Sequence, residues 1–441
     1  DISPRFTLHH GSRTSRIPLN DIALSDTPYP HLTLIKQMDV ERILVQALIE
    51  RDIYVQRDAE LIGVADGEHR ALATVRFPGG LETVEYDFVA GCDGPSSTVR
   101  AEAGIGWHGG PYGEEIVLAD VEFDASLEND VVHALAGSRG LLLAAPFGEH
   151  ATWRVLVSRP VGRDEVAFGQ PGPPVEPKEL ELMLRASGLS AQVTDVAWSA
   201  RYKLQHRLAA QFRKGRLFLV GDAAHASSPA GGQGMNMGIH DAVNIGWKLA
   251  FAMASSDMTT LLDSYQRERK PVARKILALT HLGFWMEAST SIIPSLVRGT
   301  FSTIGAPFVP VLADRRRLVA AIFRLLSQLW VGYPKSPLSV EGAPQMVAGP
   351  RAGERLPDEP VTTSAGQISS HMLIAEPGVH VFLNRDFPMM RARSRQVTYH
   401  QLLDQPGSGI VAIRPDGYIG FRCGGPDREQ LDNWLAFVGA A

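Results

Sequence analysis

The stretch GRLFLVGDAAHASSPAGGQGMNMGIHDAVNIGWKLA, residues 215–250, decides the fold. Its first run, Leu217–Val220, is short and fully hydrophobic, as in strands buried inside a layered α/β sheet. The run stops at Gly221 and Asp222, which predicts that Asp222 lies at the carboxyl end of a strand, where open sheets bind ligands. A carboxylate at that position can accept hydrogen bonds from sugar-like hydroxyl groups.

A glycine-rich turn follows and leads into a helix that is predicted to begin at about Asn236. Glycines allow close backbone approach because they carry no Cβ, and the free N–H groups of a helix start favour partial negative charge on a ligand. The residues predicted to contact that ligand are Gly221, Asp222, Pro229, Gly231, Gly232, Gly234, Met235 and Asn236. Hydrophobic spacing predicts that the inner face of the helix carries Ile239, Ala242, Val243, Gly246 and Ala250.

Two earlier segments carry further candidate binding residues. In VAGCDGPSSTVR, residues 89–100, Asp93 and Gly94 alone are typical of a hairpin turn. With Ser97 and Arg100 placed to start a helix near an anion, a ligand-binding role is favoured, although Arg100 as a surface helix residue is the alternative. In LTLIKQMDVERIL, residues 32–44, Gln37 is either a ligand contact or a solvated residue at a strand end.

These three segments, in this order, resemble motifs of the group A flavoprotein monooxygenases, the para-hydroxybenzoate hydroxylase-like family. Residues 215–250 are similar to the family's second FAD-binding motif, and residues 89–100 to a middle motif near FAD and NAD(P)H. The resemblance implies that Gln37 contacts the ribityl region of the flavin. GERLPDEPV (353–361) and IVAIRPDGYIGFR (410–422) resemble the thioredoxin-like C-terminal domain of the subgroup that acts on phenols and aromatic polyketides.

The resemblance implies an α/β fold with an α+β substrate domain. A Rossmann-like FAD-binding domain is interrupted by a β-sheet substrate domain, and a thioredoxin-like C-terminal domain follows. The expected parts are substrate-domain strands (1–36), FAD-binding segments (37–105 and 198–280), the β-sheet substrate domain (106–197), a helical connection (281–340) and the C-terminal domain (341–441).

The implied activity is hydroxylation of a phenolic or polyketide-like aromatic substrate with NAD(P)H and O2, through a flavin C4a-hydroperoxide. The cofactor carries the difficult chemistry while the protein binds, orients and excludes water, so no catalytic side chain and no metal site are expected. Baeyer–Villiger oxygenation on the same scaffold is one alternative. A flavin-less binding or interaction protein is another.

The sequence departs from the family at its start. The family opens with a strand, a GxGxxG turn and a helix, and none of these is present in the 441 residues. By analogy roughly 80 residues are expected to be missing, about the size of a βαβ unit with its extension. We therefore expect a fragment whose sheet lacks a central strand, which would expose unpaired edges and apolar faces.

Composition excludes several other classes of protein. A net charge of −5 gives no electrostatic footprint for nucleic acid, and two cysteines cannot form a disulfide framework. No apolar run approaches the roughly 20 residues that span a bilayer. We expect a cytoplasmic protein whose partners are a small aromatic substrate and O2, with no nucleic acid, no membrane, and a homodimer as the candidate assembly.

Overall fold

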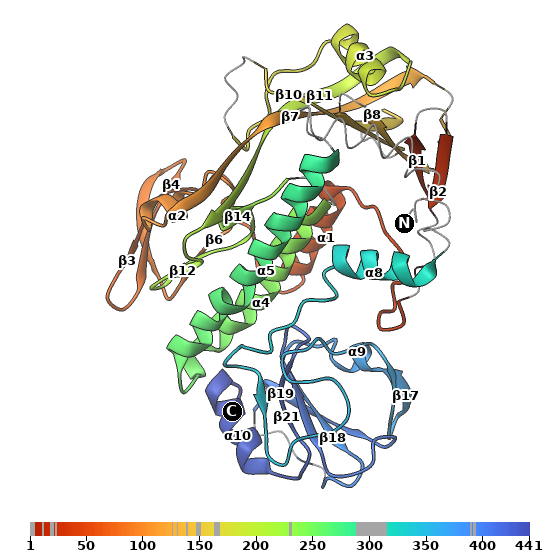
Figure 1. Cartoon of the computed structure of the whole chain (residues 1–441). Coiled ribbons are helices and arrows are strands. Elements are labelled where there is room, and N and C mark those ends of the chain that lie inside the picture. The colour runs from red at the N-terminus through yellow and green to blue at the C-terminus, as the bar shows by residue number, and fades with distance from the viewer. Residues whose placement is uncertain are drawn as a thin grey trace.

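The computed structural model describes residues 5–10, 13–17, 22, 24–125, 127–129, 131–137, 140–146, 151–162, 168–228, 232–287, 315–388, 390 and 394–441. In Figure 1 a large sheet lies at one end of the molecule and a separate C-terminal sheet at the other, with α4 and α5 between them. The helices before residue 288 are α1 (Gln37–Ile49), α2 (Thr98–Glu102), α3 (Pro177–Ala186), η1 (Gly221–Ala223), α4 (Gln233–Phe251), η3 (Ala252–Ala254) and α5 (Met258–Glu287).

The largest sheet has eight strands, and only its β1–β8 pair is parallel. In spatial order the strands are β14 (His225–Ala226), β11 (Gln192–Ala209), β7 (Trp107–Asp124), β10 (Trp153–Pro160), β9 (Gly140–Ala145), β8 (Val131–Gly137), β1 (Arg5–His10) and β2 (Arg13–Ile17). Strands from the predicted segments 1–36 and 106–197 therefore share one sheet. The expected boundary at 197/198 falls inside β11, and the domain limits stay predictions.

Alternating side chains give this sheet two different faces. On β7, Val117 and Ala119 point to one side and pack in a cluster with Leu180 of α3. Ile116, on the other side, packs in a cluster with Phe284 of α5, and Leu118 contacts that cluster. One face is therefore covered by α3, and the other turns toward α5 and the region around Asp222.

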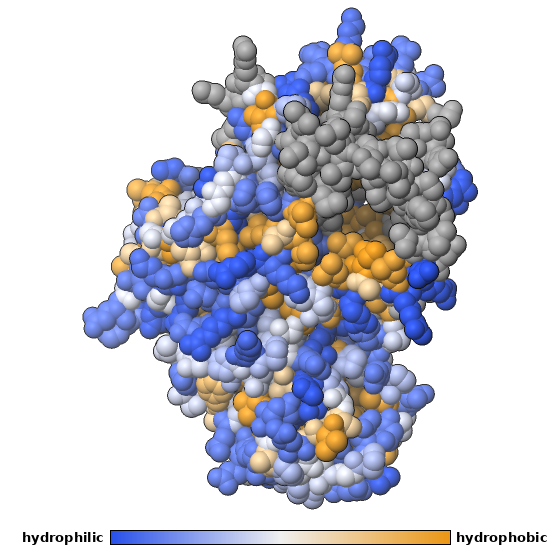
Figure 2. Space-filling model, viewed as in Figure 1, coloured by the Kyte–Doolittle hydropathy of each residue, from blue (hydrophilic) through white to orange (hydrophobic). Residues whose placement is uncertain are grey.

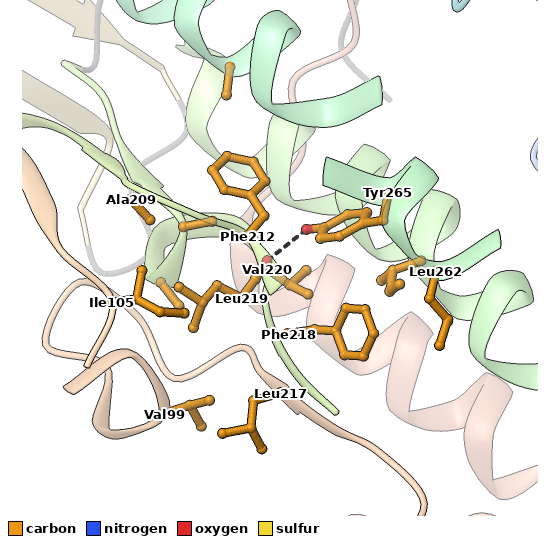
Figure 3. Close-up of a cluster of buried hydrophobic side chains, with 14 of the residues drawn as sticks. Val99, Ile105, Ala209, Phe212, Leu217, Phe218, Leu219, Val220, Leu262 and Tyr265 are labelled. Atoms are coloured by element: carbon orange, nitrogen blue, oxygen red, sulfur yellow. Dashed lines mark hydrogen bonds between the residues drawn. The ribbon is translucent and has the colours of Figure 1, made fainter. Parts of the chain in front are cut away.

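The buried strand predicted at Leu217–Val220 is confirmed as β13 (Leu217–Leu219), whose three residues are all buried. It pairs in parallel with β6 (Val89–Gly91) and antiparallel with β12 (Arg213–Lys214). Figure 3 shows Phe212, Phe218 and Tyr265 around this strand in the hydrophobic cluster that joins it to α5. The chain thus fixes the end of β13, where Asp222 follows, against a packed core.

The helix predicted after the glycine turn is confirmed as α4, which begins at Gln233, but its predicted inner face was wrong. Ile239 and Val243 are 41% and 47% exposed. The residues that α4 buries are Gln233, Met237, Asp241, Asn244, Ile245, Trp247, Lys248 and Phe251. Asp241 and Lys248 can be buried because each forms an ion pair with α5, so charge pairing outweighs hydrophobic spacing in orienting this helix.

A third sheet, β3 (Glu60–Asp66), β4 (Ala71–Phe77) and β5 (Gly80–Tyr86), is an antiparallel meander. The helix α1 has no buried residue, and its Ile43 and Leu44 are each 54% exposed. The helix α8 (Arg316–Leu326) likewise buries none of its residues. Figure 2 shows hydrophobic residues at the surface around α1 and α8. No helix in the described ranges is both long and apolar enough to cross a membrane.

The C-terminal domain has its own five-stranded sheet, in which β15–β21 and β18–β19 are parallel. Its elements are β15 (Val340–Glu341), β16 (Pro360–Thr363), β17 (Gly366–Ser369), α9 (Ser370–Leu373), β18 (Val379–Asn384), β19 (Val397–Leu402), β20 (Ile410–Ile413), β21 (Ile419–Cys423) and α10 (Arg428–Val438). Trp247 and Phe251 of α4 belong to the core of this sheet, so the domain is packed onto α4. Its assignment as thioredoxin-like stays a prediction.

Candidate functional site

The centre of the site is the turn formed by Gly221 and Asp222 at the carboxyl end of β13. Gly221 is buried with φ of +59°, a left-handed conformation that favours glycine. A Cβ on Gly221 would lie 3.4 Å from the Cα of Gly238, so the turn rests directly on the backbone of α4. In the described part of the chain, no hydrogen bond or ion pair engages the exposed carboxylate of Asp222. This carboxylate is therefore available to a ligand.

Buried side chains of α4 and β14 stabilise this turn through hydrogen bonds. Asp241 Oδ2 accepts a hydrogen bond of 3.2 Å from the backbone N–H of Gly221 and lies 2.6 Å from His225 Nε2. Burial pushes the pKa of Asp241 upward, but His225 and Arg269 outweigh burial and lower it to about 2. Asp241 is therefore an anion at neutral pH.

The middle motif lies beside the turn. Asp93 Oδ2 accepts a hydrogen bond of 3.0 Å from Val99 N–H, and Gly94 has φ of +75°. Arg100 is buried rather than a surface helix residue, and it donates to the carbonyl oxygens of Ala223 (2.9 Å) and Pro95 (2.6 Å). The guanidinium of Arg100 thus joins the two motifs, since Arg100 and Ala223 are 123 residues apart in the sequence. Direct contact of Asp93, Gly94 or Arg100 with the cofactor stays a prediction.

The start of α4 fits the backbone cradle expected of an FAD site. Gly232 caps the helix in the left-handed conformation with φ of +62°, and no side chain in the described residues caps the first N–H groups. A Cβ on Gly232 or Gly234 would meet no atom within 4 Å, so the surface beside these glycines is open. Met235 is 44% exposed and Asn236 is exposed. Contact of these residues and of Asp222 with FAD stays a prediction.

Three predicted residues lie outside this group. Pro229 and Gly231 fall outside the described residues. Gln37, the first residue of α1, is exposed and donates a hydrogen bond of 2.8 Å to Glu41 on its own helix. Its contact with the flavin stays a prediction.

A cavity of about 230 Å³ separates the Asp222 turn from the large sheet. Its walls come from β7, β10, β11, the middle motif and the turn itself. The lining residues are Pro95, Ile116, Leu118, Leu156, Phe168, Gly169, Tyr202, Lys203, Leu204, Asp222, Ala226 and Ser227. Protein atoms around the carboxyl group displace water and raise the pKa of Asp222, an effect that His225 opposes and Asp241 reinforces. One space therefore contacts both predicted cofactor motifs and the substrate sheet.

Sequence reasoning missed the supports of the turn, namely Asp241, its partner Arg269, and Tyr265, whose hydroxyl donates to the carbonyl oxygen of Leu219 at the end of β13. Asp241 lies four residues after Met237 and four before Ile245, and both of these are buried. A carboxylate in line with buried positions at helical spacing indicates a buried, paired acid, but hydrophobic spacing favoured the other face of α4, so this signal can be recognised only once the orientation of the helix is known. The cavity-lining residues of β7, β10 and β11 gave no comparable signal, because any half-buried strand shows the same alternation.

Comparison with known proteins agrees with the geometry. A family model described as FAD binding domain matches residues 3–280. The chain is 28% identical to 6-methylpretetramide 4-monooxygenase of Streptomyces rimosus, over 94% of this chain and 77% of that protein. It is 31% identical to an uncharacterised aromatic compound monooxygenase of Bacillus subtilis, over 90% of this chain and 77% of that protein.

A solved structure is similar as well. The anhydrotetracycline hydroxylase from Streptomyces rimosus superposes with a TM-score of 0.74 at 25% identity, covering 94% of this chain and 82% of that one. The α/β fold class and the family resemblance predicted from the three motifs are thereby confirmed. The chain belongs to the FAD-binding family of flavoprotein monooxygenases, the FAD-dependent aromatic hydroxylases similar to para-hydroxybenzoate hydroxylase.

Proposed function

We propose that this chain hydroxylates a phenolic or polyketide-like aromatic substrate, using FAD, NAD(P)H and O2. The proposal depends on one observation: Asp222, Pro95 and the face of the large sheet that turns toward α5 line the same cavity. A substrate in that cavity would lie against both the cofactor motifs and the sheet. This juxtaposition is what an oxygen transfer between a bound flavin and an aromatic ring requires.

The chain's own residues bind, orient and exclude water. Asp222 and the open glycine backbone at the start of α4 would hold FAD, which supplies the oxidising chemistry when bound. Ile116, Leu118 and Leu156 give the cavity an apolar wall that favours a flat aromatic ring and keeps water away from it. Tyr202 and Lys203, in the same wall, offer polar groups that can orient a ring oxygen.

The size of the cavity guides the choice of substrate. Its volume of about 230 Å³ is below the roughly 300–1,000 Å³ that is usual for ligand pockets. A phenol with one or two rings is therefore the first class to test, and a multi-ring polyketide the second.

The test is product analysis with the FAD-loaded protein. We expect a phenolic substrate to stimulate NADPH or NADH oxidation and to gain one oxygen atom from O2 as a ring hydroxyl, detected by mass spectrometry with labelled O2. An ester or lactone product would show oxygen insertion instead, as in a Baeyer–Villiger oxygenase. Protein expressed from the whole gene, with any segment that is encoded before Asp1, would contradict the proposal and favour a binding role if it took up no flavin. A homodimer and a cytoplasmic location stay predictions.

A further inference from the structure

Two consecutive residues of α5, Glu268 and Arg269, connect different parts of the molecule. Arg269 is 1% exposed, and its Nε donates a hydrogen bond of 2.6 Å to Asp241 Oδ1. Its Nη1 donates to Tyr333 Oη at 3.1 Å. Since Asp241 also accepts from Gly221, one buried guanidinium stands between the Asp222 turn and the chain that leads into the C-terminal domain.

Glu268, the residue before Arg269, binds the C-terminal domain and α4 directly. It accepts two hydrogen bonds from the buried Arg414 of the C-terminal domain, at 2.7 and 2.9 Å. Lys248 and Asn244 of α4 each donate to Glu268 Oε2 at 2.7 Å. Burial opposes the charge on Glu268, but Arg414 and Lys248 outweigh it and lower the pKa of Glu268. Four buried polar side chains therefore fasten α4, α5 and the C-terminal domain to one another.

Tyr333 closes the connection on the side of Arg269. Its backbone N–H donates to the carbonyl oxygen of Gly353 at 2.6 Å, and its ring lies 4.4 Å from that of Tyr418, centroid to centroid. Burial raises the pKa of Tyr333, so its hydroxyl stays protonated and keeps its place beside Arg269. The path from Gly221 through Asp241, Arg269 and Tyr333 to Tyr418 contains only direct contacts.

We propose that Asp241 is a positioning residue for the flavin-binding turn at Gly221 and Asp222, and that the C-terminal domain supports flavin binding through Arg269, Tyr333 and Glu268. The inference rests on the proposed function, because it assigns this turn to FAD. A carboxylate is needed at 241, since it must accept from Gly221 N–H and from Arg269 with different oxygens. An asparagine at 241 offers only one acceptor oxygen. Its NH2 group would face either the N–H of Gly221 or the guanidinium of Arg269, and neither of these can accept a hydrogen bond.

The test compares FAD binding and flavin spectra in variants of the protein expressed from its whole gene, with any segment that is encoded before Asp1. Asp241→Asn should raise the Kd for FAD about ten-fold or more, because small displacements of binding groups are costly, and should change the visible circular dichroism of bound flavin. Tyr333→Phe, which removes only the hydroxyl, should fold normally and raise the Kd by a smaller factor. It keeps the inference testable if Asp241→Asn does not fold.

A matched pair tests the role of the C-terminal domain. Arg414→Met removes a buried arginine that contacts Glu268. Arg422→Met removes a buried arginine whose partners among the described residues, including Glu341, all lie within the C-terminal domain. Arg414→Met should weaken FAD binding, and Arg422→Met should leave the Kd and the flavin spectrum as in the wild type. Wild-type Kd and spectra in Asp241→Asn or Tyr333→Phe, or equal effects of both arginine variants, would overturn this inference alone. A wild-type protein, expressed with any segment that is encoded before Asp1, would overturn the proposed function as well if it bound no FAD.

Discussion

Tyr265 and Leu219 are joined by a hydrogen bond of 2.7 Å, in which the Tyr265 hydroxyl donates to the backbone carbonyl oxygen of Leu219 (Figure 3). Both residues are fully buried. Leu219 ends β13 and lies three residues before Asp222, so this bond ties the strand that presents the site to α5.

Replacing Tyr265 should therefore destabilise the fold. Tyr265→Phe keeps the packed ring but removes the donor, and leaving a buried carbonyl oxygen without its partner costs about 1–3 kcal/mol. Denaturant unfolding should show this loss. The matched control is Tyr54→Phe, since Tyr54 is 70% exposed and its change should have little effect. Equal losses in both variants would contradict the importance of the bond.

Asp222→Ala should impair retention of FAD without unfolding the protein. The side chain is exposed and supports no hydrogen bond in the described residues, so the free energy of unfolding should change by less than about 0.5 kcal/mol. The flavin content after gel filtration should fall, because a hydrogen-bond acceptor for the cofactor is lost. Asp195→Ala, an exposed aspartate on β11, is the control and should retain flavin. Unchanged flavin content in Asp222→Ala would count against the site.

Leu156→Phe should narrow the cavity and leave FAD binding intact. Leu156 lines the cavity from β10, while Leu182 on α3 is 64% exposed. We expect Leu156→Phe to raise KM for two-ring substrates more than for single-ring phenols, and Leu182→Phe to change neither. Steady-state kinetics with both substrate sizes provides the measurement. If KM for both sizes stays at the wild-type value, the cavity is not the substrate site.

Gly221 and Gly238 face each other, yet alanine should have opposite effects at the two positions. Gly221→Ala forces a side chain into a left-handed backbone conformation, which costs about 1–2 kcal/mol. Gly238→Ala places its Cβ at an ordinary 3.6 Å from Gly221 and improves the helix by up to about 1 kcal/mol. Thermal unfolding of the flavin-free protein distinguishes the two effects. If both variants lowered the unfolding temperature equally, the backbones of Gly221 and Gly238 would not be arranged as they are in this structure.

His400 should make the stability of the C-terminal domain depend on pH. Burial, with a contribution from His380, lowers the pKa of His400 to about 4. Below about pH 6.5 the unfolded chain binds a proton that the folded domain rejects, so stability should fall from pH 6.5 to about pH 4 and then level off. The full shift corresponds to about 3 kcal/mol, but solvent screens the partly exposed His400, so the loss should be on the order of 1–2 kcal/mol. Unfolding of His400→Phe should show a flatter pH profile, while the exposed His69→Phe should follow the wild type.

The sequence predicted the local parts of the site better than their mutual supports. Leu217–Val220 and the helix after the glycine turn could be found because a short apolar run and a glycine cluster are local signals. The orientation of α4 could not, because it depends on Asp241 and Lys248 meeting Arg269 and Glu268 from another helix. A prediction from hydrophobic spacing assigns every charged residue to the surface. The face that it predicted to be buried is therefore the opposite of the face that α4 buries.

The same difficulty applies to Arg100. Its place in the middle motif was evident from the sequence, but the carbonyl oxygens that it contacts belong to Pro95 and Ala223. Backbone acceptors carry no sequence signal, since every residue has one. A basic residue near an expected anion can thus either bind that anion or join two loops by hydrogen bonds to their carbonyl oxygens. Only the folded structure distinguishes these two roles.

The course of β11 has a practical consequence for altering this enzyme. The strand lines the cavity with Tyr202, Lys203 and Leu204 and then pairs, at Leu208, with His225, which follows Asp222 by three residues. We expect a bulkier side chain on β11 to displace both the wall of the cavity and the segment from Asp222 to His225, because β11 contributes to the first and pairs with the second. Engineering of substrate range should therefore begin at Leu156 on β10, because β10 pairs with β7 and β9 and not with β11.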